Sequence, residues 1–413
     1  MSLIRLPDGW GAFVFLLTGL LFVPVFLVLL HLGQTGPKWD HITEHVLGSY
    51  TWNTVWVTVS VSIVVLLVGI PTAWLVSRYE FTGRRWFAWL LILPLALPTY
   101  VSAFVYYDVV QQAIPLRIWI RSEWGIEAFL ASEPIIRNSL LVVTLSSVLF
   151  PYVYLACRAS FSDQGGRLYE AARSLGKSPR AAFFSVILPM ARPAIVAGLA
   201  LVIMEIINDY GAVHYFGVPT LTEGIFRTWI GHEDRISALK LASIAIVAIT
   251  MLLVFEKLLR GRARFEDSRS QPLARIPLRG TRSILAVVIC LIPLTAGFFY
   301  PVWRLASWAS TGLFSGRPGR FEFSSEILAG TTVALATAAI VTALAVVFAY
   351  AVHLRPKTWR AGAGRIAALG YATPGVVVAL GVMATLGAFD RWDLPLPLLS
   401  GTFFAIGFAY AVR

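Results

Sequence analysis

Two acidic residues stand out because they lie inside an otherwise apolar stretch. Glu205 and Asp209 are four residues apart, so a helix would place both on one face. Ionisable groups at such positions in membrane helices face a cavity or a polar partner. Asn208, Tyr210 and Gly211 extend this polar face. We predict that it lines a translocation pathway or its gate; the alternative is a structural ion pair or hydrogen-bonded pair between helices.

Two short motifs resemble parts of known catalytic or phosphate-binding motifs, but neither completes its pattern. His41–His45 reads HITEH, which fits the His-x-x-Glu-His metalloprotease pattern, yet it lies in a short loop with no evident third ligand. Gly176-Lys177-Ser178 ends like a phosphate-binding loop, but Ala171 holds the place of that loop's first glycine. We therefore predict no catalytic residue, no metal site and no cofactor bound by this chain.

The composition indicates a membrane protein. The chain has 413 residues, of which 57% are hydrophobic and 14% charged, and its mean hydropathy is +0.73. A spanning helix needs about 20 mainly apolar residues. Such windows lie near residues 11–32, 55–77, 87–110, 138–157, 193–216, 238–256, 283–306, 327–352 and 362–388, and another begins near Leu396. We predict an all-α, polytopic membrane bundle.

The distribution of charge predicts the orientation. The net charge is +12, and Lys and Arg gather in the loops that are cytoplasmic if the N-terminus is cytoplasmic. This is the positive-inside pattern, so the basic excess indicates topology rather than nucleic-acid binding. Cys157 and Cys290 both fall in predicted spans, which argues against a disulfide framework. The first apolar run lacks a cleavage pattern, so we interpret it as an uncleaved first span.

The spans form two similar halves. The stretch from Asn53 has a counterpart from Thr331, and Pro98 in the next span corresponds to Pro374. We predict a first half of six spans over 1–260, a basic cytoplasmic linker over 261–282, and an incomplete second half of about four spans over 283–413. Chance similarity between apolar helices is the alternative. The repeat register also predicts that the chain is part of a longer one.

The polar segment at 160–192, which interrupts the apolar spans, carries most of the functional information. We call it the polar interruption. Apolar residues at helical spacing predict a first amphipathic helix, made of Leu168, Ala171, Ala172 and Leu175. Gly176 should end it, and Ser178-Pro179 should cap and start a second helix. That helix carries Phe183, Phe184, Ile187 and Leu188 on one flank and should end at Pro189. The pair could lie on lipid or fit a groove of a partner protein.

This interruption resembles the cytoplasmic loop of the permease subunits of ABC importers. That loop has the form Glu-Ala-Ala, three residues, Gly, nine residues, Ile, one residue, Leu-Pro. Here the matching residues are Glu170, Ala171, Ala172, Gly176, Leu188 and Pro189, with Val186 in the Ile place. The resemblance implies the permease fold and coupling helices that dock on a separate ATPase subunit, present in two copies, which hydrolyses the ATP.

A second resemblance concerns the substrate. The segment Glu205–Trp229 looks like the corresponding part of the fused two-half permeases for ferric iron. The family implies a multi-pass protein of the bacterial inner membrane that receives substrate from a periplasmic or extracellular binding protein. Permeases for thiamine, polyamines, sulfate or phosphonates share the coupling loop and remain alternatives. An ion-driven secondary transporter and a membrane-embedded metallopeptidase are more distant ones.

Overall fold

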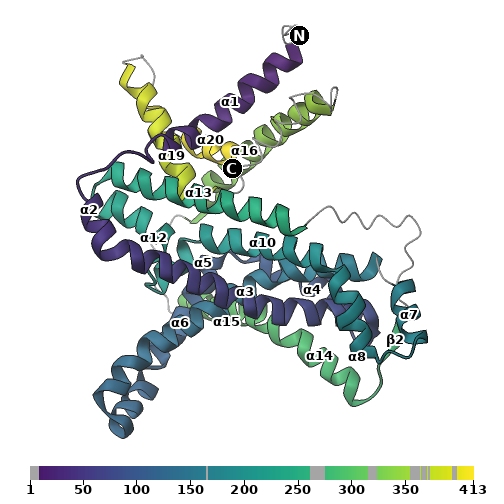
Figure 1. Ribbon diagram of the computed structural model, residues 1–413. Helices are drawn as coiled ribbons and strands as arrows, with labels where there is room; N and C mark the ends of the chain where they lie inside the picture. The colour runs from purple at the N-terminus through teal and green to yellow at the C-terminus, as the bar shows by residue number, and fades with distance from the viewer. Residues whose placement is uncertain are drawn as a thin grey trace. The chain divides into compact units, whose positions relative to one another are not determined.

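The protein is almost entirely helical, as the sequence predicts. The computed structural model describes residues 9–163, 166–260, 275–314, 323–353, 363, 370, 373–392 and 398–413 (Figure 1). In these ranges β structure is confined to two short parallel strands, β1 (Tyr79–Glu80) and β2 (Ile276–Pro277). Six described helical stretches are long and apolar enough to cross a membrane, namely Gly9–Leu29, Trp39–Arg78, Thr99–Ser162, Arg235–Leu252, Thr281–Thr311 and Ser324–His353.

The chain divides into two compact units that do not coincide with the predicted halves. Unit 1 comprises Met1–Leu47, Gly224–Ile249 and Pro318–Arg413, and unit 2 comprises Gly48–Glu223 and Thr250–Arg317. Each unit therefore combines segments from both sides of the linker. The units describe packing, whereas the halves describe a sequence repeat. The repeat boundaries at 260 and 283 remain a prediction.

Unit 2 holds the polar interruption and most of the predicted site residues. Its elements are α3 (Leu47–Arg78), β1, α4 (Arg84–Leu90), η2 (Leu93–Ala96), α5 (Thr99–Gln112), α6 (Ile114–Asp163), α7 (Gly166–Ser174), α8 (Pro179–Ala182), η3 (Phe183–Ile187), α9 (Leu188–Met190), α10 (Arg192–Asn208), α11 (Gly211–Tyr215), β2, α14 (Thr281–Leu294), η5 (Thr295–Phe299) and α15 (Tyr300–Phe314). A buried apolar cluster on α3, α5, α6 and α10 forms its core. Figure 1 shows α7, α8 and β2 at the same end of this unit.

Two of the predicted windows are not continuous helices. The window near 87–110 breaks between α4 and α5, where Pro94 and Pro98 remove backbone donors. The backbone carbonyl of Ala88, near the end of α4, instead accepts hydrogen bonds from the Tyr154 hydroxyl (3.2 Å) and Arg158 Nη1 (2.5 Å). The window near 193–216 breaks between α10 and α11, at Asp209. Both breaks matter for the site described below.

Unit 1 is built around α1 (Gly9–Leu29), which packs on α19 (Gly375–Phe389). Its other elements are α2 (Trp39–His41), η1 (Ile42–Val46), η4 (Arg227–Gly231), the first part of α13 (Arg235–Arg260), α16 (Phe323–His353), η6 (Asp390–Trp392), η7 (Leu399–Gly401) and α20 (Phe403–Val412), while α12 (Leu221–Phe226) crosses the unit boundary. The hydroxyl of Ser243 on α13 donates to the Val28 carbonyl of α1 at 2.6 Å. Polar contacts of this kind hold helices together where lipid supplies no hydrophobic drive.

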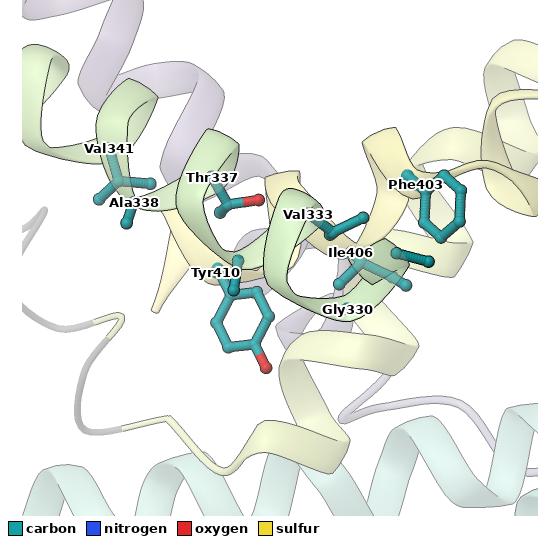
Figure 2. Close-up of a pocket in the computed structure, with 10 residues that line it drawn as sticks. Gly330, Val333, Thr337, Ala338, Val341, Phe403, Ile406 and Tyr410 are labelled. Carbon is teal, nitrogen blue, oxygen red and sulfur yellow. The ribbon is translucent and has the colours of Figure 1, made fainter. Parts of the chain in front are cut away.

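A groove of about 630 Å³ lies between α16 and α20 of unit 1 (Figure 2). Val333 of α16 points toward Phe403 and Ile406 of α20, and Gly330, Ala338 and Val341 of α16 also line the groove. The hydroxyls of Thr337 and Tyr410 are the side-chain oxygens of this lining, which contains no charged group. Such a surface suits an acyl chain or another helix and offers nothing to compensate a dehydrated ion.

The N-terminus of α13 has an acidic cap that should make unit 1 sensitive to acid. Asp234 accepts hydrogen bonds from the backbone N–H groups of Lys38 (2.8 Å) and Ser237 (3.1 Å). Burial raises the pKa of Asp234, but hydrogen bonds from Ser237, Lys38 and Ile236 outweigh it and hold the pKa below the ordinary value. The cap therefore stabilises the fold above the unfolded-state pKa of about 3.9, and this contribution is lost as the pH falls through the lower, folded-state pKa.

We expect Asp234→Ala to lower the free energy of unfolding near neutral pH by about 0.5–2 kcal/mol, the usual value of an N-cap. The difference from the unmodified protein should shrink as the pH approaches 3. Thermal unfolding in detergent between pH 7 and pH 3 measures both effects. Asp40→Ala, at an exposed position of the same unit, is the control. An equal destabilisation at every pH would contradict the prediction.

Candidate functional site

The polar interruption folds as helix, bend and helix, as predicted. Helix α7 ends in a left-handed Gly176 with φ +86°. The N–H of Lys177 reaches the Ala172 carbonyl at 3.1 Å, and the N–H of Gly176 reaches the Arg173 carbonyl at 3.1 Å. This is the Schellman pattern of helix termination. Because Gly176 serves as this helix stop, the local Gly-Lys-Ser sequence is part of a turn between helices.

The second helix begins where the sequence predicts but ends later. The Ser178 hydroxyl accepts the N–H of Ala181 at 3.2 Å, and Pro179 occupies the first helical turn. The helix made of α8, η3 and α9 ends at Met190, one residue beyond the predicted Pro189. The five-residue π segment η3 precedes the proline and widens the turn that its ring must fit. The chain then bends by 65° into α10.

Four aromatic rings hold these helices to the spans of unit 2. We call Trp74, Phe161, Tyr169 and Phe183 the aromatic anchor. The Trp74 ring on α3 lies 5.5 Å from Phe161, 6.2 Å from Tyr169 and 4.7 Å from Phe183 between ring centroids. The Arg78 guanidinium lies 4.6 Å from the centre of the Tyr169 ring. The anchor thus joins α7 and η3 to the ends of α3 and α6.

The buried face of α7 differs from the predicted stripe. Of the four stripe residues, Ala172 is buried, whereas Leu168 is 54% and Leu175 85% exposed, and Ala171 is exposed as well. Tyr169 is buried together with Ala172, and its ring packs against Trp74. The spacing of apolar residues predicted the helix but could not show which of its faces packs against the rest of the protein.

An exposed apolar surface therefore points away from the anchor. We call Leu168, Leu175 and Phe184 the outward face, the last being 64% exposed. Glu170 of the motif is also exposed, and Leu188 and Pro189 are half-buried. Large apolar side chains exposed on a polar segment are typical of a protein-docking surface.

The second candidate region, Glu205–Gly211, lies at the break between α10 and α11. Asp209 ends α10 with an extended ψ of 113°, and its Oδ1 accepts the N–H of Ala212 at 2.7 Å. The side chain of Thr99 and the N–H of Val213 also hydrogen-bond this carboxyl group. The hydroxyl of Thr222 donates to the Ile207 carbonyl that the break sets free. The polar backbone groups of the break are thus satisfied inside the protein, as membrane depth requires.

This break faces the one before α5. A Cβ on Gly211 would lie 2.5 Å from the Cβ of Tyr100, so only glycine allows the approach. Thr99 and Tyr100 directly follow Pro98, which ends the irregular segment between α4 and α5. Glu205 and Asn208 are half-buried nearby on α10, and the Tyr210 ring stacks on His214 at 5.0 Å. Two interrupted helices therefore meet at the predicted pathway residues.

The geometry separates the roles of the two acidic residues. Asp209 is 8% exposed and holds the break together. We expect Asp209→Asn to destabilise the protein by about 1–3 kcal/mol. The carboxyl group accepts hydrogen bonds from several donors, whereas the amide would point its NH2 group at one of these donors. Glu205→Gln should leave stability unchanged and lower transport if Glu205 lines the pathway. Thermal unfolding and uptake at matched expression distinguish these results, and unchanged uptake in Glu205→Gln would contradict the pathway role.

Comparison with known proteins identifies the family. Residues 65–260 match the model of the binding-protein-dependent transport system inner membrane component. A "Probable molybdenum ABC transporter permease protein" of Haloferax volcanii is 30% identical over 212 residues, which cover 50% of this chain and 74% of that protein. The chain belongs to this family of permeases.

Other relatives of the permease differ in how much of it they match. The Fe(3+)-transport system permease protein FbpB 2 of Haemophilus influenzae is 29% identical over 399 residues, or 92% of this chain and 72% of that protein. The sulfate transport system permease protein CysT of Salmonella typhimurium is 26% identical over 247 residues, or 57% of this chain and 85% of that protein. The predicted family, all-α fold and membrane-transport class are confirmed.

The HITEH motif of the permease lies in α2 and η1. His41 and His45 stack with ring centroids 4.8 Å apart, and both are exposed. Within the described ranges no three His, Cys, Asp or Glu side chains gather in a way that could hold a metal ion. A catalytic zinc site needs three protein ligands, and the absence of such a site in this chain stays a prediction.

Sequence reasoning missed two features of the permease. The aromatic anchor had a local signal, because Trp74 and Phe161 stand at the ends of apolar windows beside the polar interruption. The second feature is a clamp on the segment after α11. Asn53 Nδ2 donates to the Pro219 carbonyl at 3.1 Å, and the N–H of Leu221 donates to the Thr54 hydroxyl at 2.9 Å. These contacts join residues far apart in the chain, and no local pattern predicts them.

Proposed function

We propose that this permease imports ferric iron, delivered by an external binding protein and driven by two copies of a separate ATPase. The N-terminus would be cytoplasmic, which places α7 to α9 on the side where ATP is available. The chain itself would bind neither ATP nor another cofactor. Family membership supports an importer. The substrate, the two ATPase copies, the orientation and the absence of a bound cofactor are parts of the proposal.

One observation carries the choice of substrate. The match to the permease named for Fe(3+) transport extends over 92% of this chain, including both predicted halves. The matches to the molybdenum and sulfate permeases cover 50% and 57%. Two permease halves in one polypeptide would then be an architecture that this chain shares with the ferric relative. Sulfate, molybdate, thiamine, polyamines and phosphonates are the alternative substrates, and an uptake experiment can distinguish them from ferric iron.

The coupling role is supported by the two sides of the helical pair. Its inner side is held by the aromatic anchor, and its outward face exposes Leu168, Leu175 and Phe184. A docked ATPase would bury this face and move the pair as it closes on ATP. Because ring packing is dense and directional, the motion would pass to α3 and α6 rather than dissipate in a loose loop.

The same motion would reach the helix break. Met190 and Ala191 join the pair directly to α10, whose far end is the break at Asp209. Helix breaks are places where backbone dihedrals can change at low cost. Rocking of α10 would then alter the contact between Gly211 and Tyr100 and open or close the passage past Glu205 and Asn208. The binding protein captures the substrate, so the permease needs only weak contacts to it.

Transport by the reconstituted complex tests the substrate. Vesicles that contain the permease and its ATPase should accumulate radioactive ferric iron when the binding protein and ATP are present. Excess unlabelled sulfate or molybdate should not compete. ATP-dependent accumulation of one of the alternative solutes, with no iron uptake, would overturn the ferric assignment and leave the permease class intact. Uptake driven by a proton gradient without ATP would overturn the coupling scheme.

A further inference from the structure

Two spans of unit 2 end at the level where β1 and β2 pair. The span that contains α3 ends directly before β1, and the span that contains α14 begins shortly after β2. The N–H of Leu278 donates to the Glu80 carbonyl at 2.8 Å, and the N–H of Thr82 donates to the Ser283 hydroxyl at 3.2 Å. These contacts bring α4, which follows β1, beside the start of α14, at the end of the unit that carries α7 and α8 (Figure 1).

The charge pattern of two spans places this level at the surface of the hydrocarbon core. Residues 138–157 of α6 contain no charged side chain, and Arg158 follows them. Residues 283–303, from α14 to the start of α15, contain none either, and Arg282 precedes them. Each stretch is about 30 Å long at 1.5 Å per residue, which matches the thickness of the core. Arg158 and Arg282 therefore lie where the core meets the lipid headgroups.

Arg158 also joins α6 to α4 at this level. Its Nη1 donates to the Ala88 carbonyl at 2.5 Å, and its guanidinium lies 5.9 Å from the centre of the Trp89 ring. Trp89 is 72% exposed. Arg85, four residues earlier, is exposed on the same face of α4. Because Trp is enriched at the headgroup level and Arg extends its side chain toward it, this face of α4 suits contact with headgroups.

Positive charge at this level lacks a negative partner within the protein. We call Arg85, Arg158, Arg279 and Arg282 the arginine patch. The segments 82–92 and 275–285 contain no acidic residue. Glu80, just before the first of them, is already paired with Arg84 at 2.9 Å. Over the part of the chain that the structure describes, no member of the patch forms an ion pair. The patch therefore offers its charge to an anion from outside the protein.

We propose that the arginine patch binds the headgroup of an anionic phospholipid. Arg158 and Arg282 lie at the depth of the headgroups, and guanidinium groups form strong charge-assisted hydrogen bonds with phosphate. The N-terminus of α14, at Gly280, has no side-chain cap and adds the positive end of the helix dipole. A soluble partner would meet the headgroups before it reached this depth. Basic clusters between membrane helices on the cytoplasmic side suit anionic headgroups.

The proposal does not depend on which solute is transported. With a cytoplasmic N-terminus the patch faces the inner leaflet. A bound headgroup would hold α4 and the start of α14 together, at the point where the chain enters the span after β2.

Native mass spectrometry of the whole permease can measure this binding. The protein is purified in mild detergent, stripped of lipid and titrated with phosphatidylglycerol or phosphatidylcholine, with inorganic phosphate as a competitor. Arg279 and Arg282 are replaced together, by glutamine in one variant and by lysine in another. Arg121→Gln with Arg391→Gln is the matched control, because both are exposed arginines outside the patch. Thermal unfolding without lipid shows that each variant is folded.

We expect phosphatidylglycerol to bind at least tenfold more tightly than phosphatidylcholine, in the order of magnitude that two arginines provide. The glutamine variant should bind it about thirtyfold more weakly, since each basic side chain contributes about fivefold. The lysine variant and the control should retain binding, and equimolar phosphate should not compete. Unchanged binding by the glutamine variant, equal binding of phosphatidylcholine, competition by phosphate, or an equal loss in the lysine variant would each overturn the proposal.

Co-purification of the ATPase separates a lipid site from a protein-docking site. The glutamine variant should still bind the ATPase, because the outward face is unchanged. Loss of ATPase binding together with full retention of phosphatidylglycerol would assign the arginine patch to the protein partner and contradict the lipid proposal.

Discussion

Leu175→Asp should abolish uptake while leaving the permease folded. The side chain is 85% exposed on the outward face of α7, so the substitution removes little native packing. In a docked complex the same position would place an unpaired carboxylate against the ATPase. We expect the affinity for the ATPase to fall about thirtyfold, or about 2 kcal/mol, which is typical of a central interface residue.

The neighbouring Ser174 supplies a matched control for this experiment. It is exposed on the same helix but polar, so Ser174→Asp adds the same charge without removing an apolar contact. Co-purification of the ATPase and ATP-dependent uptake in vesicles should both fail in Leu175→Asp and persist in Ser174→Asp. Normal ATPase binding by Leu175→Asp would show that the outward face is not the docking surface. Failure of both variants would indicate a general effect of charge.

Trp74→Ala should separate ATPase binding from transport. The Trp74 ring contacts three other rings of the aromatic anchor. Its removal should cost about 3–5 kcal/mol of stability, as for other packed aromatic residues. The outward face would remain on α7 and η3, so the ATPase should still bind. With the anchor loosened, its motion would no longer reach α3 and α6, and uptake should fall much further than ATPase binding.

The control for this prediction is Trp86→Ala, because Trp86 lies on α4 of the same unit and is 75% exposed. ATP hydrolysis, ATPase co-purification and uptake are compared for both variants at a temperature where both remain folded. Uptake at the unmodified level in Trp74→Ala would contradict the anchor's role in coupling. Loss of ATPase binding in parallel with uptake would show that the anchor shapes the docking surface itself.

The local structure of α7 and α8 could be predicted from sequence. Gly176 as a left-handed stop and Ser178-Pro179 as a cap and first turn depend on neighbours a few residues away. The end of the second helix was predicted to within one residue, but the π turn that precedes it was not. Pro189 is tolerated because the backbone before it widens into a π turn, and that adjustment depends on packing around Ile187, which is 2% exposed.

The candidate pathway residues show the same limit. Spacing predicted that Glu205 and Asp209 share a helix face and that Gly211 permits a close approach, and the packing of Gly211 on Tyr100 confirms the second point. It could not show that Asp209 ends a helix and binds the backbone of the next one. That arrangement depends on the break at Pro98, which lies about a hundred residues earlier and brings Thr99 and Tyr100 to the site. Long-range packing decided which acidic group is structural.

The packing of α1 on α19 has a consequence for how the protein assembles during synthesis. Residues Gly9–Leu29 leave the ribosome first, and their partner Gly375–Phe389 follows after α13 and α16. At bacterial rates of about 5–20 residues per second the delay is about 20–70 s. During that time α1 must wait in the bilayer without α19. Its sequence contains no charged residue, so this first helix can remain inserted until its partner is made.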